Sequence, residues 1–155
     1  MLGGLRVVRA ALVITAVSGG SWAAAHEGAP GIVGERMKAM SRLGDEMKAL
    51  ARLVRRQASG PEIARRARII RDLGQNVSAM FPPGTDKDPH TDAKPAIWQN
   101  WSEFVDLAHR SQNRADELIQ AAEQSDRAKI GESFTALTQA CGACHERFRA
   151  KRHHH

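Results

Sequence analysis

Four stretches of this 155-residue sequence repeat their apolar residues at alternating steps of three and four positions. This spacing places the apolar side chains on one face of an α-helix and leaves the opposite face to solvent. A chain of this length forms one domain. We therefore expect an all-α, up-and-down four-helix bundle in which the four apolar faces form a common core.

Turn and capping residues mark the boundaries between the four helices. The first helix is expected to run from about Val33 to around Gln57. Residues 59–61, Ser-Gly-Pro, then supply an N-cap serine and a first-turn proline for the second helix. Residues 81–95 contain four prolines and a glycine and are expected to form the one long loop. The third helix opens at the end of this loop, and Ser125 is expected to cap the fourth.

The beginning of the chain has the pattern of a secretory signal peptide. Arg6 and Arg9 precede an apolar run over residues 10–17, and residues 23–25 form a small-residue cleavage site. The apolar run is well short of the ~20 residues that a membrane-spanning helix needs. We therefore expect a soluble, exported product. The expected organisation is a cleaved leader, a helical bundle and a disordered tail, over residues 1–25, 26–152 and 153–155.

Basic residues gather in the first half of the chain. Removing the leader takes away two arginines and no acid, so the formal charge falls from +6 to +4. Between positions 42 and 71 there are nine basic residues against three acids, Asp45, Glu46 and Glu62. This stretch is either a solvated helical face or a docking surface for an acidic partner. Repulsion between two such surfaces favours a monomer over a homodimer. Nucleic acid is not an expected partner, because basic and aromatic residues are not interleaved.

The segment Cys141-Gly142-Ala143-Cys144-His145 has the spacing of covalent haem attachment. Two thiols three positions apart on one helical face reach the two vinyl groups at one edge of a porphyrin and add to them as thioethers. The adjacent histidine then supplies a nitrogen ligand to the iron. We therefore expect one covalent haem c, held by Cys141 and Cys144, with His145 as an axial ligand.

Three other kinds of site also use a pair of cysteines. A disulfide would close a very small loop inside a helix and strain its geometry. A thioredoxin-like redox pair starts a helix after a strand, and no strand is expected here. A zinc site needs further ligands, and only the scattered His26, His90 and His109 are available. These alternatives are weaker than haem attachment.

The first helix offers candidates for the other side of the haem. Met40 lies on its apolar face, and a thioether is a soft ligand that His/Met cytochromes use for iron. Met37, Met47 and Met80 are rivals, and a methionine on a helix face is often only a core residue. Arg36 lies one turn before Met40, where a buried cation needs a partner, and a haem propionate is a natural one. An arginine that reaches past the apolar face to water is the alternative.

Four groups of residues resemble the cytochrome c′ family in order and spacing along the whole predicted bundle. They are Arg36-x-x-x-Met40-x-x-x-Gly44-x-x-Met47, Phe81-Pro82-Pro83-Gly84-Thr85, Lys94-Pro95-Ala96-Ile97-Trp98 and Cys141-x-x-Cys144-His145-x-x-Phe148-Arg149. The resemblance implies a left-handed four-helix bundle whose C-terminal helix holds the haem. It also implies a location in the bacterial periplasm.

Within that family, the resemblance implies two kinds of distal site. Where a methionine at the position of Met40 coordinates the iron, the haem is low-spin and the protein carries electrons. Where it does not, the iron is five-coordinate and binds nitric oxide or carbon monoxide. The residues around Arg36 and the 81–85 segment resemble the low-spin members more closely. We therefore predict an electron carrier, not an enzyme, with a His145/Met40 haem and redox proteins as partners. A high-spin, gas-binding cytochrome is the alternative.

Further residues are expected around the haem. Arg149 matches a basic position that lies near the proximal ligand in the family, where a cation would raise the reduction potential. A helix C-terminal arginine that interacts with the helix dipole is the alternative. Met47, Trp98 and Phe148 are expected to line the haem pocket. The three histidines at positions 153–155 are expected to be disordered.

Overall fold

The computed structural model describes residues 31–150, so the predicted signal peptide and the histidine tail lie outside the described residues. Within this range the chain forms four long helices, a short helix and a 3-10 turn. Their bounds are α1 Gly31–Arg55, α2 Gly60–Gly74, η1 Ser78–Met80, α3 Ala96–Gln99, α4 Trp101–Glu123 and α5 Arg127–Phe148. Residues 31–150 hold no strand beyond an isolated bridge between Ala93 and Arg149. None of the helices in this range combines the length and the hydropathy that a bilayer-spanning segment requires.

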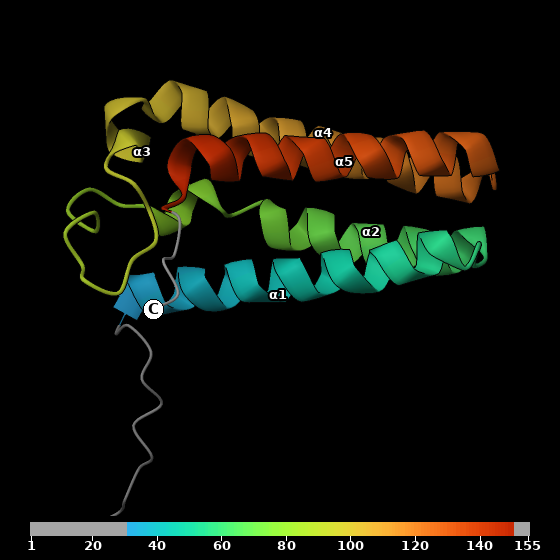
Figure 1. Ribbon diagram of the computed structural model, residues 1–155, viewed down its shortest axis with the longest axis horizontal. Coiled ribbons are helices and arrows are strands. Elements are labelled where there is room, and N and C mark those ends of the chain that lie inside the picture. Colours follow the sequence, from blue (N-terminus) through green and yellow to red (C-terminus); the bar gives the residue numbers. More distant parts are fainter. Residues whose placement is uncertain (1–30, 151–155) are drawn as a thin grey trace, which may run out of the picture.

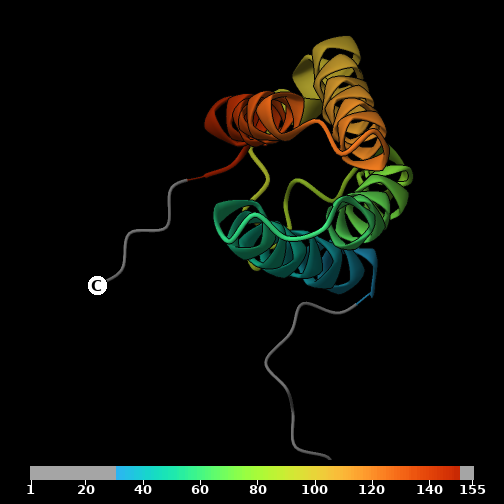
Figure 2. The ribbon, with the colours of Figure 1, turned by 90° about the vertical axis from the view of Figure 1, so that its right-hand side faces the viewer.

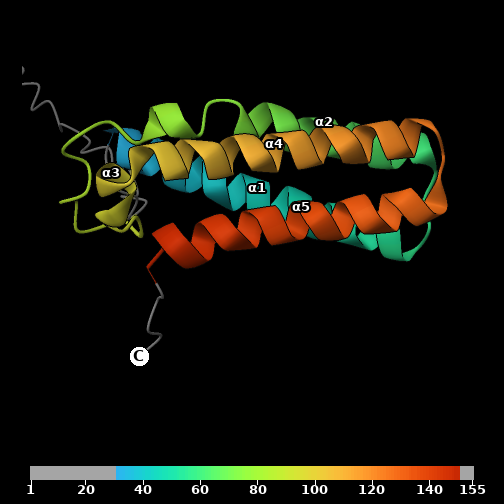
Figure 3. The ribbon, with the colours of Figure 1, turned by 90° about the horizontal axis from the view of Figure 1, so that it is seen from above.

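The four long helices run alternately up and down and pack side by side (Figure 1). Seen end on, they follow one another around the bundle in the order α1, α2, α4 and α5 (Figure 2). α2 packs closely against α1 and α4, and α4 packs closely against α5, whereas α1 and α5 touch at few points. The view from above shows the 81–95 loop at the same end as the start of α1 and the end of α5 (Figure 3). The predicted all-α four-helix bundle is therefore confirmed, and its α1–α5 side is the least closely packed.

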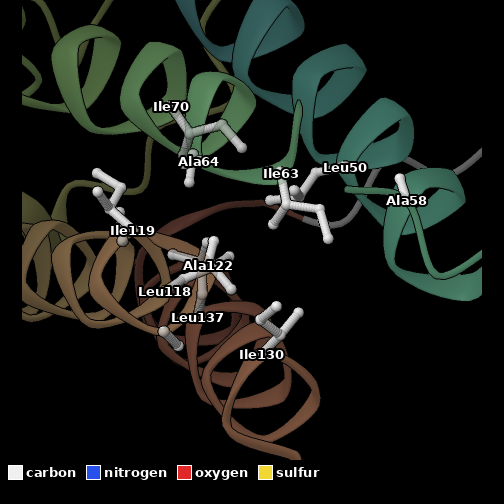
Figure 4. Packing of buried hydrophobic residues seen from close by; sticks show 13 residues of the cluster. Leu50, Ala58, Ile63, Ala64, Ile70, Leu118, Ile119, Ala122, Ile130 and Leu137 are labelled. Carbon is white, nitrogen blue, oxygen red and sulfur yellow. The ribbon is translucent and has the colours of Figure 1, made fainter. Parts of the chain in front are cut away.

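Two apolar clusters fill the bundle. The larger one joins all four long helices in the half of the bundle away from the 81–95 loop (Figure 4). Its largest fully buried side chains are Leu50, Ile63, Leu118 and Leu137. Because each such side chain contributes roughly 1.5–3 kcal/mol when it is buried, this cluster is the main source of hydrophobic stabilisation.

The second cluster, which we call the loop-end cluster, consists of Val77, Phe81, Ile97, Phe104 and Phe148. Phe104 meets Phe81 and Phe148 edge to face, with ring centroids 4.8 Å and 5.5 Å apart. Such aromatic contacts add about 0.5–1.5 kcal/mol each beyond the area that they bury. The cluster therefore anchors both the 81–95 loop and the last turn of α5 to the bundle.

The third and fourth helices start differently from the sequence-based prediction. Asn100 splits the predicted third helix: its backbone has φ −131° and ψ 51°, and its side-chain amide donates to the Ala96 carbonyl at 3.0 Å. A short polar side chain competes in this way with helical hydrogen bonds. The prediction that Ser125 caps the fourth helix is wrong, because Ser125 has a positive φ of 54°. Asp126 caps α5 instead, by accepting a hydrogen bond from the Lys129 N–H at 3.1 Å.

Gly60 lies where the first turn of α2 meets the end of α4. A Cβ at this position would stand 2.1 Å from the Ala122 carbonyl oxygen and 3.0 Å from the Ser125 hydroxyl. Because the nearer atom belongs to the backbone of α4, it cannot move aside without shifting the helix. Ser59 takes the N-cap position of α2, as predicted, but its side chain makes no capping hydrogen bond. The absence of a side chain at Gly60 is therefore what allows α2 to approach α4 so closely.

We expect Gly60→Ala to lower the free energy of unfolding by about 1–3 kcal/mol, the usual range for an overpacked site. Gly131→Ala is the matched control, because a Cβ there meets nothing within 4 Å and alanine favours a helix by up to ~1 kcal/mol. Urea unfolding followed by circular dichroism measures both variants. Equal stability of the two would contradict the close approach of α2 and α4.

Candidate functional site

α5 presents two thiols toward the interior of the bundle, as predicted. Cys141 packs against the larger cluster and Cys144 against the loop-end cluster. Both are partly buried free thiols. Burial raises the pKa of the Cys141 thiol, and burial together with the neighbouring Cys141 raises the pKa of Cys144 to about 11. Both thiols are therefore protonated near neutral pH. They also lie on one face of one helix, which is the arrangement that two thioether bonds to one planar group require.

His145 follows Cys144 on the last turn of α5, at the exposed edge of the helix. Partial desolvation and, to a lesser extent, the Arg149 cation lower the pKa of its imidazole. A lowered pKa keeps the ring neutral near pH 7, with a nitrogen lone pair available to a metal. Little more than one helical turn therefore carries the two thiols and the imidazole that covalent haem needs.

Three of the four candidate methionines divide between the two clusters, and the fourth, Met37, packs against neither. Met40 of α1 packs against the loop-end cluster, which Cys144 contacts from α5. Met80 of η1 also packs there. Met47 packs against the larger cluster, to which Cys141 belongs. Met40, Met80 and Cys144, the residue before His145, thus all pack against the loop-end cluster, while a bond between Met40 and iron stays a prediction.

Arg36 of α1 is buried, with 2% of its surface exposed. Its guanidinium donates hydrogen bonds to the Thr85 hydroxyl at 2.9 Å, the Thr85 carbonyl at 3.1 Å and the Met80 carbonyl at 3.4 Å. A further hydrogen bond goes to the Thr91 hydroxyl. Desolvation lowers the pKa of the guanidinium, and the Asp88 carboxylate acts in the opposite direction. Since arginine stays charged in proteins, Arg36 is a buried cation that binds the 81–95 loop.

The guanidinium of Arg36 also lies close to two aromatic rings. Its central carbon lies 4.8 Å from the ring centroid of Phe81 and 5.9 Å from that of Trp98. Trp98 in turn donates from Nε1 to the Phe81 and Pro82 carbonyls at 3.0 Å and 3.1 Å. Trp98, predicted to line the haem pocket, packs on the loop-end cluster and holds the start of the loop. The polar and ring contacts of Arg36 that the structure shows are therefore with the 81–95 loop and with η1 and α3 on either side of it. Its contact with a haem propionate stays a prediction.

The other end of the 81–95 loop is fastened to α5. The Lys94 N–H donates to the Phe148 carbonyl at 2.9 Å, and the Ala150 N–H donates to the Asp92 carbonyl at 2.8 Å. Arg149 Nε lies 4.0 Å from Asp92 Oδ2. Phe148 itself is buried in the loop-end cluster. The loop therefore joins α1 to α5, which pack less closely than the other pairs of neighbouring long helices.

The residues on this side of the bundle fit a haem. α1 and α5 touch at few points, yet they present partly buried apolar and sulfur side chains to the two clusters, namely Met40, Leu43, Cys141 and Cys144. Side chains of this kind exclude water from a flat apolar group. The two thiols would attach the haem, and His145 would supply a ligand to its iron.

Three residues of the 81–95 loop, Thr85, Thr91 and Lys94, were given no role by the sequence analysis. Thr85 and Lys94 stand in segments that resemble the cytochrome c′ family, which was the available signal, but the pattern alone gives them no function. Thr91 lies in a stretch without periodicity and carried no signal. Their roles depend on contacts with residues about fifty positions away, which a local pattern does not encode.

Known proteins similar to this chain include several cytochromes c′. The family model described as cytochrome c′ matches residues 31–149. Cytochrome c′ from Pararhodospirillum photometricum is 37% identical over 115 residues, which cover 74% of this chain and 92% of that protein. Cytochrome c′ from Rhodospirillum rubrum is 39% identical over 89 residues, which cover 57% of this chain and 60% of that protein.

A solved structure shows the same similarity in three dimensions. It is the nitric oxide complex of a leucine-to-alanine variant of cytochrome c prime from Alcaligenes xylosoxidans. The two structures agree with a TM-score of 0.71 at 26% sequence identity. The superposition covers 78% of this chain and 94% of the other.

We expect Arg36→Met to lower the free energy of unfolding by about 2–4 kcal/mol, because it leaves the Thr85 and Met80 carbonyls without a buried donor. Arg42→Met is the matched control, since Arg42 lies on the same helix and is exposed. Urea unfolding measures the stability, and amide hydrogen exchange over residues 81–94 measures the loop. If both variants keep the stability and exchange rates of the unsubstituted protein, Arg36 does not hold the loop.

Proposed function

This chain belongs to the cytochrome c′ family, and we propose that its haem iron binds nitric oxide or carbon monoxide. The family binds one covalent haem c, and Cys141 and Cys144 are present for its attachment. When bound, the haem supplies an iron atom that takes up a small ligand or exchanges one electron. In this proposal His145 is the protein ligand, and the residues of α1 determine what else can approach the iron.

The observation that carries the proposal is the apolar character of the α1 side chains at this end. Met40 and Leu43 are the residues of α1 that pack against the loop-end cluster, and neither has a hydrogen-bond donor. The buried cation of α1, Arg36, directs its donors to the loop residues Thr85 and Thr91. A neutral diatomic gas needs no polar partner, whereas burying an anion in such surroundings would be costly.

One similar solved structure supports the same interpretation. The cytochrome c prime from Alcaligenes xylosoxidans is seen as a nitric oxide complex. We extend that kind of ligand to this chain because the fold agrees over 78% of it and because α1 is apolar here. Gas binding therefore takes precedence over the electron carrier that the sequence favoured.

The electron carrier, with Met40 as the second iron ligand, remains as a second candidate. One observation favours it, because Met40 and Cys144, the residue before His145, both pack against the loop-end cluster. A methionine sulfur bonded to the iron would leave no position for a gas. The two candidates therefore differ in one bond, between the Met40 sulfur and iron. Redox proteins would be the partners in this second case, and the predicted signal peptide assigns either activity to the periplasm.

The basic surface of α1 and α2 is partly neutralised by ion pairs. Arg66 pairs with Glu46 at 2.6 Å, and Arg56 pairs with Glu62 at 2.9 Å. On α1 and α2, four exposed arginines make no ion pair with another residue of the 31–150 range, and these are Arg42, Arg52, Arg55 and Arg65. Their positive field fits an acidic partner surface and disfavours a two-fold dimer built from α1 and α2.

We expect carbon monoxide to shift the absorption spectrum of the reduced, haem-loaded protein. Met40→Leu is expected to keep that response, because in this proposal the Met40 sulfur is not bonded to iron. Met47→Leu is the matched control, since Met47 packs against the larger cluster. A sharp low-spin spectrum that ignores the gas, with a gas response gained only in Met40→Leu, would overturn gas binding and establish the electron carrier.

We expect the mature protein to sediment as a monomer at about 0.15 M salt, where charges within ~8 Å of each other still interact. Two copies joined through α1 and α2 would bring their unpaired arginines together. Analytical ultracentrifugation, repeated at about 1 M salt to screen the charges, measures this. A stable dimer at the lower salt concentration would contradict the monomer.

A further inference from the structure

The end of α5 lacks a glycine cap. α5 ends at Phe148, and the following Arg149 is extended, with φ −104° and ψ 133°. A helix that ends in a left-handed glycine satisfies its last carbonyls with its own N–H groups. Here the carbonyls of Glu146, Arg147 and Phe148, the three residues after His145, need partners from elsewhere in the protein.

One residue of the loop, Lys94, supplies those partners. Its N–H donates to the Phe148 carbonyl at 2.9 Å. Its ammonium donates to the Glu146 carbonyl at 3.0 Å and to the Arg147 carbonyl at 3.4 Å. Lys94 therefore satisfies three consecutive carbonyls that directly follow His145.

Lys94 is itself held from two sides. Its carbonyl accepts a hydrogen bond from the Ile97 N–H at 3.1 Å, at the start of α3. Ile97 is buried in the loop-end cluster. Three residues before Lys94, the Thr91 hydroxyl is bonded by Arg36 of α1. Lys94 therefore connects the end of α5 to α3 directly and to α1 through the nearby Thr91.

The charge of Lys94 acts on the same turn as its hydrogen bonds. The C-terminus of a helix carries a partial negative charge, and a cation there is stabilising. The ammonium lies against the carbonyls of Glu146 and Arg147. Charge and hydrogen bonding therefore both restrain the turn that carries His145.

We propose that Lys94 is a positioning residue for His145. Lys94 acts through the backbone of residues 146–148, which fixes the last turn of α5 and with it the orientation of the imidazole. The proposal rests on His145 as the iron ligand, which both candidate functions share. It is therefore independent of whether the Met40 sulfur is bonded to iron.

The test uses the haem-loaded protein and compares substitutions at two lysines. Lys94→Met removes the ammonium and keeps the backbone N–H, and Lys94→Arg keeps a cation that can reach the same carbonyls. Lys129→Met is the matched control, because Lys129 lies in the first turn of α5 and ion-pairs only with the nearby Asp126 among the described residues. Amide hydrogen exchange over residues 145–149 measures the turn. The hyperfine-shifted proton resonances of the His145 ring in the ferric protein measure the imidazole.

Lys94→Met is expected to speed exchange over residues 145–149 by roughly tenfold, as for lost hydrogen bonds at a helix end, and to shift the His145 ring resonances. Lys94→Arg is expected to restore both, and Lys129→Met to match the unsubstituted protein. Faster exchange with unmoved ring resonances would make Lys94 a structural cap only and would overturn the proposal. The same holds if Lys94→Met and Lys129→Met are indistinguishable.

Two further outcomes of the experiment have a defined interpretation. If Lys94→Met does not mature, Lys94→Gln, which keeps a shorter neutral donor, is judged by the same two readouts. If the unsubstituted protein shows no hyperfine-shifted histidine resonance, His145 is not the iron ligand, and the proposal is overturned together with both candidate functions. A failure of gas binding alone, measured on the unsubstituted protein, leaves the Lys94 test intact.

Discussion

The buried guanidinium of Arg36 makes the contacts that hold together the end of the bundle where the 81–95 loop lies. Removing a cation from water costs several kcal/mol unless hydrogen bonds replace the water. Here Thr85, Thr91 and the Met80 carbonyl accept those bonds, and the Phe81 ring covers one face of the cation. Because α1 and α5 touch at few points, the loop held in this way is the main protein connection between these two helices.

This arrangement lets the bundle stay closed although α1 and α5 pack loosely against each other. A four-helix bundle usually closes by packing every helix on two neighbours. In this protein α2 and α4 do so, while α1 and α5 leave their shared side to partly buried sulfur and apolar groups such as Met40 and Cys144. In the proposed function the same apolar surface would limit what can reach the iron, because it accepts a neutral ligand or a thioether more readily than a charged group.

The fold and the placement of the two thiols on one helix face were predictable because both follow from local spacing. Ile130 and Leu137 recur at helical steps and are buried, and the two cysteines lie three positions apart on the same face. The break at Asn100 was missed, since its side chain competes with the helix only in this setting. Thr91 and Lys94 were also missed, because each acts on a residue about fifty positions away.

Covalent attachment of one haem at Cys141 and Cys144 is tested most directly by the intact mass of the protein made in a host that matures c-type cytochromes. The predicted result is the mass of the processed chain plus one haem that denaturants do not remove. The double variant Cys141→Ser, Cys144→Ser should carry no such haem. A bare chain with two free thiols in the unsubstituted protein would contradict the assignment of this site.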